Sequence, residues 1–192
     1  MSPRTAEENE RLRLSRKKEI IESAVEVISV HGAHDTSMSM IAKEAGISKG
    51  LIYAYFDNKE QLYRAIVAYG FEILSEVFGF KEDRELTDEI LSGKIDRVFD
   101  MLKSDSAFWG IYLNVIMQRE MIGIMRDLLM EYFEPFFNQL NKYYERKGAE
   151  DPLAMTMLFG AALDGISINY MVREDEFPLE RVKNLVKTIF IR

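Results

Sequence analysis

The chain has 192 residues, of which 47% are apolar and 30% charged, with a formal net charge of -7, as is ordinary for a soluble globular protein of one or two domains. The absence of cysteine excludes disulfides, zinc–thiolate sites and cysteine nucleophiles. No long run of uncharged apolar residues indicates a membrane span, and the N-terminus lacks the apolar core of a signal peptide, so we expect a cytoplasmic protein with no membrane partner.

Most of the chain repeats its apolar residues with the period of an α-helix, and no stretch shows the sustained alternation of a strand. We therefore predict an all-α fold with about nine helices. The first helix is predicted from about Ser15 to His31, because Gly32 provides a left-handed stop. A second, short helix follows Thr36 and Ser37, either of which can cap it.

Gly46 ends the second helix, and a third short helix is predicted to begin near Ser48. A longer helix follows Asn58, because Asn58 and Gln61 have the spacing of a capping box, and this helix ends near Gly79. Capping residues, or the return of an apolar stripe, mark the remaining helix starts. We place these starts at Thr87, Ser104, Gly123, Asp151 and Pro178.

Residues 37–56 have the pattern of a helix-turn-helix. Two short helices that cross steeply need a small residue where their backbones meet, which Ala42 supplies, and a turn with positive φ, which Gly46 supplies. The spacing of these two residues and of Ile52 matches the geometry of the motif. The apolar side chains expected to hold the pair together are those of Ile41, Ala45, Ile47 and Ile52.

The outward-facing residues of this segment suit contact with DNA. They are Ser48, Lys49, Gly50, Tyr53, Tyr55 and Lys59. The first three stand at the start of the third helix, the end that enters the major groove in such motifs, and the glycine lets the backbone approach closely. The two tyrosines and Lys59 offer donors to phosphates. A plain helical hairpin would explain the turn and the apolar residues equally well, but not this outward set.

The net negative charge is unevenly distributed. Up to Gly70 the chain has ten Lys or Arg against ten Asp or Glu, whereas the remainder has fifteen against twenty-two. An acidic remainder would repel DNA and leave contact to the N-terminal part. A basic cluster in that part is either an extension of the DNA surface or the solvated start of a helix. It consists of Arg11, Arg13, Arg16, Lys17 and Lys18.

A family resemblance covers Arg16 to Val67. Several motifs match in register: the glycine after the first helix, Thr-Ser, Ile-Ala, Ala-Gly-Ile-Ser, Gly-x-Ile-Tyr-x-Tyr-Phe and Asn-Lys-Glu-x-Leu. The segment strongly resembles the DNA-binding region of TetR/AcrR-family transcriptional regulators. The resemblance implies a DNA surface formed by Thr36 or Ser37, Ser48, Lys49, Gly50, Tyr53, Tyr55 and Lys59.

The resemblance also implies two functional domains. Residues 1–58 would form the helix-turn-helix DNA-binding domain, and residues 59–192, beginning with a linking helix, a helical ligand-binding and dimerisation domain. The protein would be a homodimer that binds double-stranded operator DNA, most often as a repressor that a small-molecule effector releases. No cofactor is expected.

Aromatic and methionine residues are concentrated between residues 108 and 144. Methionine adapts its shape and aromatic rings supply large contacts, so this composition favours a pocket for an apolar or amphipathic effector. Ordinary core residues are the alternative. A missing deep pocket, or one lined mainly by charges, would argue against this effector class. The predicted lining is Phe108, Trp109, Tyr112, Met117, Met121, Met125, Phe133 and Phe137.

The segment from Pro152 to Val172 is apolar nearly all round, so it must be covered on more than one side. Its own chain could cover it, but packing with the last helix against the same pair from a second subunit is favoured. Such a two-fold dimer would place two recognition helices about 34–36 Å apart or a multiple of that. The predicted interface is Leu158, Ala161, Ala162, Gly165, Val182, Leu185, Val186 and Ile189.

Two rival functions are less well supported. An enzyme would need a reactive cluster, but the only histidines, His31 and His34, fall at the end of a helix without a carboxylate cluster, and neither a phosphate loop nor a serine elbow is present. Neither catalysis nor a metal site is expected. A scaffold protein would have no reason to present the outward set beyond the glycine turn.

Overall fold

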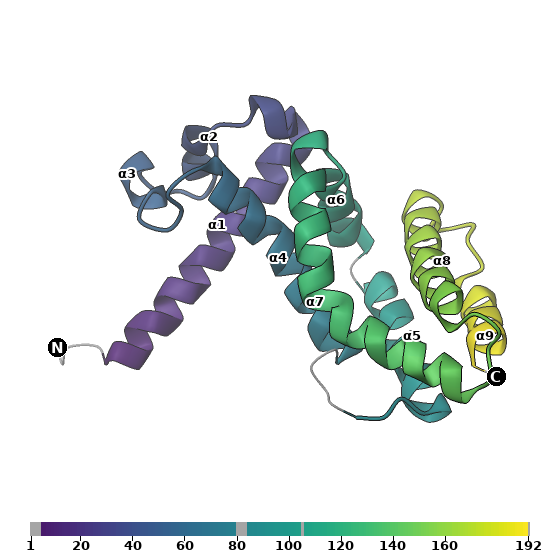
Figure 1. The fold of residues 1–192 in the computed structure, drawn as a ribbon. Coiled ribbons are helices and arrows are strands. Elements are labelled where there is room, and N and C mark those ends of the chain that lie inside the picture. The colour runs from purple at the N-terminus through teal and green to yellow at the C-terminus, as the bar shows by residue number, and fades with distance from the viewer. Residues whose placement is uncertain (1–4, 80–83, 105, 192) are drawn as a thin grey trace. The chain divides into compact units, whose positions relative to one another are not determined.

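The computed structural model describes residues 5–79, 84–104 and 106–191, and every regular element within these ranges is an α-helix (Figure 1). The prediction of an all-α fold is confirmed. Within the described ranges the helices are α1 (Ala6–Asp35), α2 (Met38–Glu44), α3 (Lys49–Ile52), α4 (Lys59–Phe78), α5 (Asp88–Ser104), α6 (Ser106–Ile116), α7 (Arg119–Arg146), α8 (Pro152–Val172) and α9 (Leu179–Phe190).

Helix α1 begins well before the predicted Ser15. A capping box holds its start: the Thr5 hydroxyl accepts a hydrogen bond from the Glu8 N–H, and the Glu8 carboxylate accepts one from the Thr5 N–H. The predicted stop at Gly32 is a break, since this glycine has φ 79° and helical structure continues beyond it to Asp35. No apolar stripe marks the first turns, which is why the pattern alone missed them.

Two of the later helix starts, at Thr87 and Asp151, follow the predicted capping chemistry. The Thr87 hydroxyl accepts the Ile90 N–H, and the Asp151 carboxylate accepts the Ala154 N–H with Pro152 at the first helical position. Helix α7 starts at Arg119, earlier than the predicted Gly123.

Residues cluster into two compact units, which are described separately. The head unit contains the chain up to Gly70 together with Ile111–Leu128, and the body unit contains Phe71–Gly110 together with Leu129 onward. Residues 111–128 thus belong to the head by compactness. The functional boundary at residues 58 and 59 remains a prediction.

Apolar side chains of α1 pack against the short helices to form the core of the head. Ile20, Ile28, Ile41 and Ile52 are all fully buried. Burying such a side chain contributes about 1.5–3 kcal/mol each, which is how a four-residue helix such as α3 is kept in place. Ala45 and Ile47 are only partly buried.

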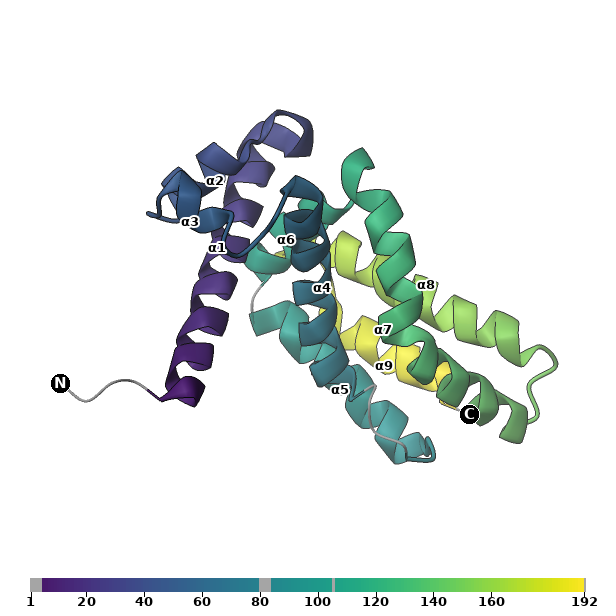
Figure 2. The ribbon, with the colours of Figure 1, turned by 60° about the vertical axis from the view of Figure 1, so that its left-hand side comes forward.

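The body unit has a second core, rich in aromatic rings. Phe136 and Phe159 have ring centroids 6.4 Å apart, and Phe159 meets Phe190 edge-on at 5.2 Å, which joins α7, α8 and α9. Figures 1 and 2 show α8 and α9 side by side. The ammonium group of buried Lys94 donates to the carbonyl of Gly79, which follows the end of α4.

Among the described residues, α8 is the one helix that is long enough and apolar enough to cross a membrane. Length and composition are weak evidence, because core helices of soluble proteins pass the same test. Its single charged residue, Asp164, lies near its middle, and Phe159, Leu163 and Tyr170 pack into the body core. Little of its apolar stretch is buried in the single chain.

Candidate functional site

The helix-turn-helix has the expected local geometry. The Ser37 hydroxyl caps α2 by accepting the Met40 N–H at 3.3 Å, and the Ser48 hydroxyl caps α3 by accepting the Leu51 N–H at 3.2 Å. Gly46 turns the chain with φ 63°. A residue with a side chain would be strained there, so the glycine is required by the backbone.

The predicted outward residues of α3 are on the surface. Lys49 and Gly50 are exposed on its first turn, and Tyr53, at its C-terminal end, has 44% of its surface accessible. Tyr55 is half-buried. A side-chain carbon added at Gly50 would meet no atom within 4 Å, so the backbone there is open to close approach. This arrangement offers an ammonium group, a phenol and bare backbone on one helical turn.

Two of the predicted DNA contacts have structural partners. Thr36 is buried, and its hydroxyl donates to the Gly32 carbonyl at 2.8 Å, so Ser37 is the member of the pair that can reach a ligand on the surface. Lys59 is half-buried and donates to the His34 carbonyl at 3.1 Å. Its ammonium group also lies 5.4 Å from the centre of the Tyr63 ring.

The break at Gly32 creates a junction that the sequence did not predict. Because the positive φ interrupts the helical ladder, the Ala33 N–H needs another acceptor, which is the side-chain oxygen of Gln118. The Ala33 carbonyl in turn accepts the Tyr63 hydroxyl. Burial raises the pKa of Tyr63 to about 12, with a smaller contribution from the Glu120 carboxylate, so this phenol stays a donor at neutral pH.

A second contact joins α6 to α4 within the head. The Tyr112 hydroxyl donates to the Val67 carbonyl at 2.7 Å, and its ring crosses α4 where Gly70 has no side chain. A carbon added at Gly70 would overlap the ring. Tyr112 is thus a buried structural residue, with 1% of its surface accessible.

The residues predicted to line an effector pocket do not share one environment. Trp109, Tyr112 and Met121 are buried, whereas Met117 is exposed. Phe108, Met125, Phe133 and Phe137 are partly buried. In the body, Phe133 meets Phe71 edge-on at 5.1 Å and packs beside Phe137. These contacts are those of core residues, and the lining remains a prediction.

Two recesses on the described surface lie elsewhere in the body. One, of about 320 Å³, lies between the start of α5 and the end of α7; the other, of about 440 Å³, lies between α5 and α9. None of the eight predicted lining residues contributes to either, and charged side chains are prominent in both. The recesses therefore give no geometric support to an apolar effector.

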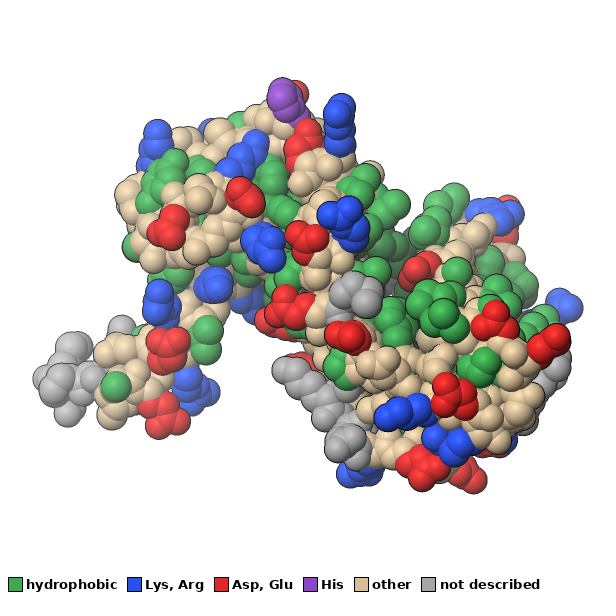
Figure 3. Space-filling model, in the orientation of Figure 1, with side chains coloured by type: hydrophobic (Ala, Val, Ile, Leu, Met, Phe, Trp, Pro, Cys, Tyr) green, Lys and Arg blue, Asp and Glu red, His purple; other side chains and the backbone are tan. Residues whose placement is uncertain are grey.

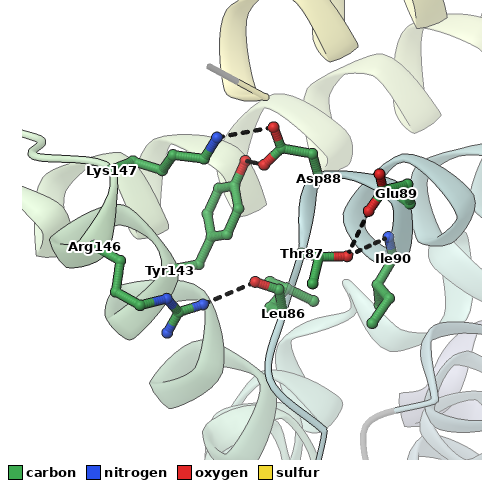
Figure 4. A network of polar contacts seen from close by, with 8 residues as sticks. All are labelled: Leu86, Thr87, Asp88, Glu89, Ile90, Tyr143, Arg146 and Lys147. Carbon is green, nitrogen blue, oxygen red and sulfur yellow. Dashed lines mark hydrogen bonds and ion pairs between the residues drawn. The ribbon is translucent and has the colours of Figure 1, made fainter.

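Figure 4 shows the polar network beside the first recess. The Asp88 carboxylate, at the start of α5, accepts a hydrogen bond from the Tyr143 hydroxyl at 2.9 Å and pairs with the Lys147 ammonium at 2.8 Å. The guanidinium of Arg146 donates to the Leu86 carbonyl at 2.8 Å. Lys147, and then Tyr143, lower the pKa of Asp88, whereas burial, followed by Asp88, raises the pKa of Tyr143. This network, the α5–α7 clasp, satisfies its own charges and fits a structural role.

The predicted interface residues leave an apolar surface on α8 and α9. Leu158 and Leu185 have 54% and 59% of their surfaces accessible, and Ile189 and Ala161 are exposed as well. Ala162, Gly165 and Val182 are half-buried. Val186 is the exception, because it is buried in the body core.

The two histidines lie on the surface near the end of α1. His31 and His34 are both exposed, and the His34 Nδ1 lies 3.9 Å from a Glu120 oxygen. Among the described residues, no group of three or more His, Asp or Glu side chains is placed to hold a metal ion.

Comparison with known families gives a match at the head. The model of bacterial regulatory proteins of the tetR family matches residues 20–66. This range runs from the buried part of α1 through α2 and α3 into α4, and includes the capping serines and Gly46.

Relatives extend the similarity over most of the chain. The HTH-type transcriptional regulator BetI of Pseudomonas fluorescens is 35% identical over 182 residues, with 86% of each chain covered. The fatty acid metabolism regulator protein of Bacillus subtilis is 26% identical, with 90% of this chain and 92% of that protein covered. The structure of the regulator FadR from B. subtilis in complex with stearoyl-CoA has a TM-score of 0.68 and 24% identity, and covers 91% of this chain and 97% of that one.

Proposed function

The chain belongs to the TetR family of transcriptional regulators, a family without enzymatic activity, and we propose that it is a repressor that binds operator DNA as a homodimer and is released by a small amphipathic effector. It acts in the cytoplasm, where its operator lies.

One observation carries the DNA-binding part of the proposal. Helix α3 presents Lys49, Gly50 and Tyr53 on a surface that the rest of the head leaves open, while Ser48 fixes its first turn. The ammonium group suits a phosphate or a guanine edge, the phenol suits a phosphate, and the bare backbone permits entry into the major groove.

A gel-shift assay with the DNA upstream of the protein's own gene tests this proposal. Wild-type protein should bind, and Lys49→Ala or Tyr53→Ala should each weaken binding by roughly 1–3 kcal/mol, with a shallower salt dependence for the lysine variant. Lys142→Ala, an exposed lysine of α7 in the body, is the matched control and should bind normally. Salt-independent binding, or equal loss in the control, would reject the proposal.

The exposed apolar surface of α8 and α9 supports the homodimer. Its large side chains Leu158 and Leu185 are more than half accessible in the part of the chain that the structure describes. A second copy related by a two-fold axis would cover both helices at once and would pair two heads for a two-half-site operator.

The effector class rests on relatives rather than on a recess. A structure of similar fold is described in complex with stearoyl-CoA, and a relative is named a fatty acid metabolism regulator. Long acyl chains need apolar surroundings, which the phenylalanine-rich body core can provide if its side chains move apart.

Thermal unfolding with defined probes tests the effector class. Stearoyl-CoA should raise the melting temperature and release operator DNA, whereas CoA alone at the same concentration should do neither, because a ligand stabilises only the state that binds it. The same result with both probes, or with neither, would reject an amphipathic acyl effector while leaving DNA binding intact.

A further inference from the structure

The N-terminal part of α1 is a helical arm that buries none of its residues against the described part of the chain. Every residue from Thr5 to Glu19 is exposed, including Leu12 and Leu14. A short helix that buries no apolar face is only marginally stable in water, so the Thr5–Glu8 capping box and the exposed Arg16–Glu19 pair at 2.5 Å matter for its order.

The charge of the arm is concentrated in one stretch. Residues 11–18, with the sequence RLRLSRKK, contain five Lys or Arg and no Asp or Glu; we call this stretch the basic arm. Acidic residues lie outside it, at Glu7, Glu8 and Glu10 before it and Glu19 after it. In Figure 3, Lys and Arg side chains follow α1 between the N-terminal end and the short helices.

Helical periodicity divides the basic arm into two sides. Arg13 and Lys17 precede Ile20 and Ala24 by seven residues each, so they continue the stripe by which α1 packs on the helix-turn-helix. The contact of the Lys17 ammonium with the Phe56 ring, at 5.7 Å, agrees with this placement.

A second side of the arm turns towards α4. Lys18 lies 5.8 Å from the centre of the Tyr69 ring and 3.7 Å from the Glu22 carboxylate. Arg11 is seven residues before Lys18, so it shares this side. The two sides therefore supply an internal comparison with matched residue types.

We propose that the basic arm is a second DNA contact, in which Arg13, Arg16 and Lys17 bind backbone phosphates that flank the bases read by α3. The partner is argued from charge: a dense run of cations, of which Lys17 lies against Phe56 just after the recognition helix α3, complements a polyanion. The Arg16–Glu19 pair is exposed at both ends and is easily exchanged for a phosphate, since such pairs contribute at most about 1 kcal/mol.

This proposal rests on the proposed DNA-binding function and predicts a distinct signature. Phosphate contacts carry no sequence information, so Arg13→Gln with Lys17→Gln should weaken binding to operator and to unrelated duplex by the same factor, roughly five-fold for each contact at physiological salt. The slope of log K against log salt should become shallower by about 0.9 per contact. Lys49→Ala should instead weaken discrimination between the two duplexes.

Arg11→Gln is the matched control, because it removes one arginine from the same arm on the side that faces α4. It should leave affinity and salt slope close to wild type. All variants change exposed residues, so circular dichroism should show unchanged melting.

The outcomes separate the two proposals. If the Arg13 and Lys17 variant binds with wild-type affinity and slope while Lys49→Ala fails, the arm proposal is overturned and the proposed function stands. If wild-type protein binds no duplex, both fail. Sedimentation with phosphatidylserine vesicles that persists in the presence of duplex DNA would assign the arm to a membrane surface and overturn the DNA contact.

Discussion

The head and the α8–α9 surface use their apolar residues in opposite ways. In the head, large apolar side chains such as Ile28, Ile41 and Ile52 are fully buried, and the recognition helix presents polar groups and bare backbone. On α8 and α9, Leu158 and Leu185 are more than half accessible. Exposed apolar patches of this kind mark surfaces that bind other molecules. The proposed homodimer would cover the α8–α9 surface, whereas the buried core of the head needs no second copy.

The largest expected effect, loss of the dimer, comes from introducing charge on the α8–α9 surface. Leu158→Asp with Leu185→Asp should convert a dimer to a monomer in sedimentation, because each charge would face its own copy across a two-fold axis. Operator affinity should fall on the order of 10²-fold, since two linked heads bind far more tightly than one.

Val30→Asp is the control for this comparison, because Val30 is a highly exposed apolar residue of α1 in the head. It should leave the protein dimeric. Dimers that survive the α8–α9 substitutions, or that are lost equally in the control, would show that accessibility alone does not distinguish the two regions.

Glycine provides a sharper comparison within the head. Gly70→Ala should lower the free energy of unfolding by about 1–3 kcal/mol, because the new methyl group overlaps the Tyr112 ring. Gly50→Ala, also in a helix, meets no neighbour and should be neutral or slightly stabilising, yet should weaken operator binding where the backbone approaches DNA. Urea unfolding and gel shifts measure the two effects.

A double-mutant cycle tests whether the Tyr112 ring is the reason that residue 70 must be glycine. In a Tyr112→Ala background, Gly70→Ala should cost much less than in the wild type, which a double-mutant cycle would report as a coupling energy. Equal costs in the two backgrounds would mean that the ring does not set the requirement for glycine.

Features decided by neighbouring residues were predictable from the sequence. The caps at Ser37 and Ser48, and the turn at Gly46, follow from interactions within a few residues, and the structure confirms all three. The start of α1, which the apolar pattern missed, could also have been predicted, because Thr5 and Glu8 have capping-box spacing.

Features that join distant parts of the chain were not predictable. Gln118 and Ala33 are 85 residues apart, and Tyr112 and Val67 are 45 apart. Periodicity marks a residue as apolar or polar but does not name its partner, so the sequence did not predict that the Tyr112 hydroxyl donates to the Val67 carbonyl. The same gap explains why the pocket lining remains a prediction.

The smallest expected effect is on the acid stability of the body, through the Asp88 carboxylate of the α5–α7 clasp. The pKa of Asp88 is lowered by Lys147 and then by Tyr143, so its contribution to stability is present above the unfolded-state pKa of about 3.9 and is lost as pH falls through the lower folded value. Asp88→Asn should therefore reduce stability at neutral pH slightly and flatten its decline in acid. Because the pair is exposed, high salt should reduce the difference.

Urea unfolding between pH 7 and strongly acidic pH measures this, with Glu134→Gln, an exposed carboxylate of the same α7, as the control. The control should retain the wild-type acid decline. If Asp88→Asn also retains it, the clasp does not contribute to the acid sensitivity of the body. If the decline in stability with falling pH flattens only in Asp88→Asn, the ionised Asp88 carboxylate stabilises the body by linking the start of α5 to the end of α7.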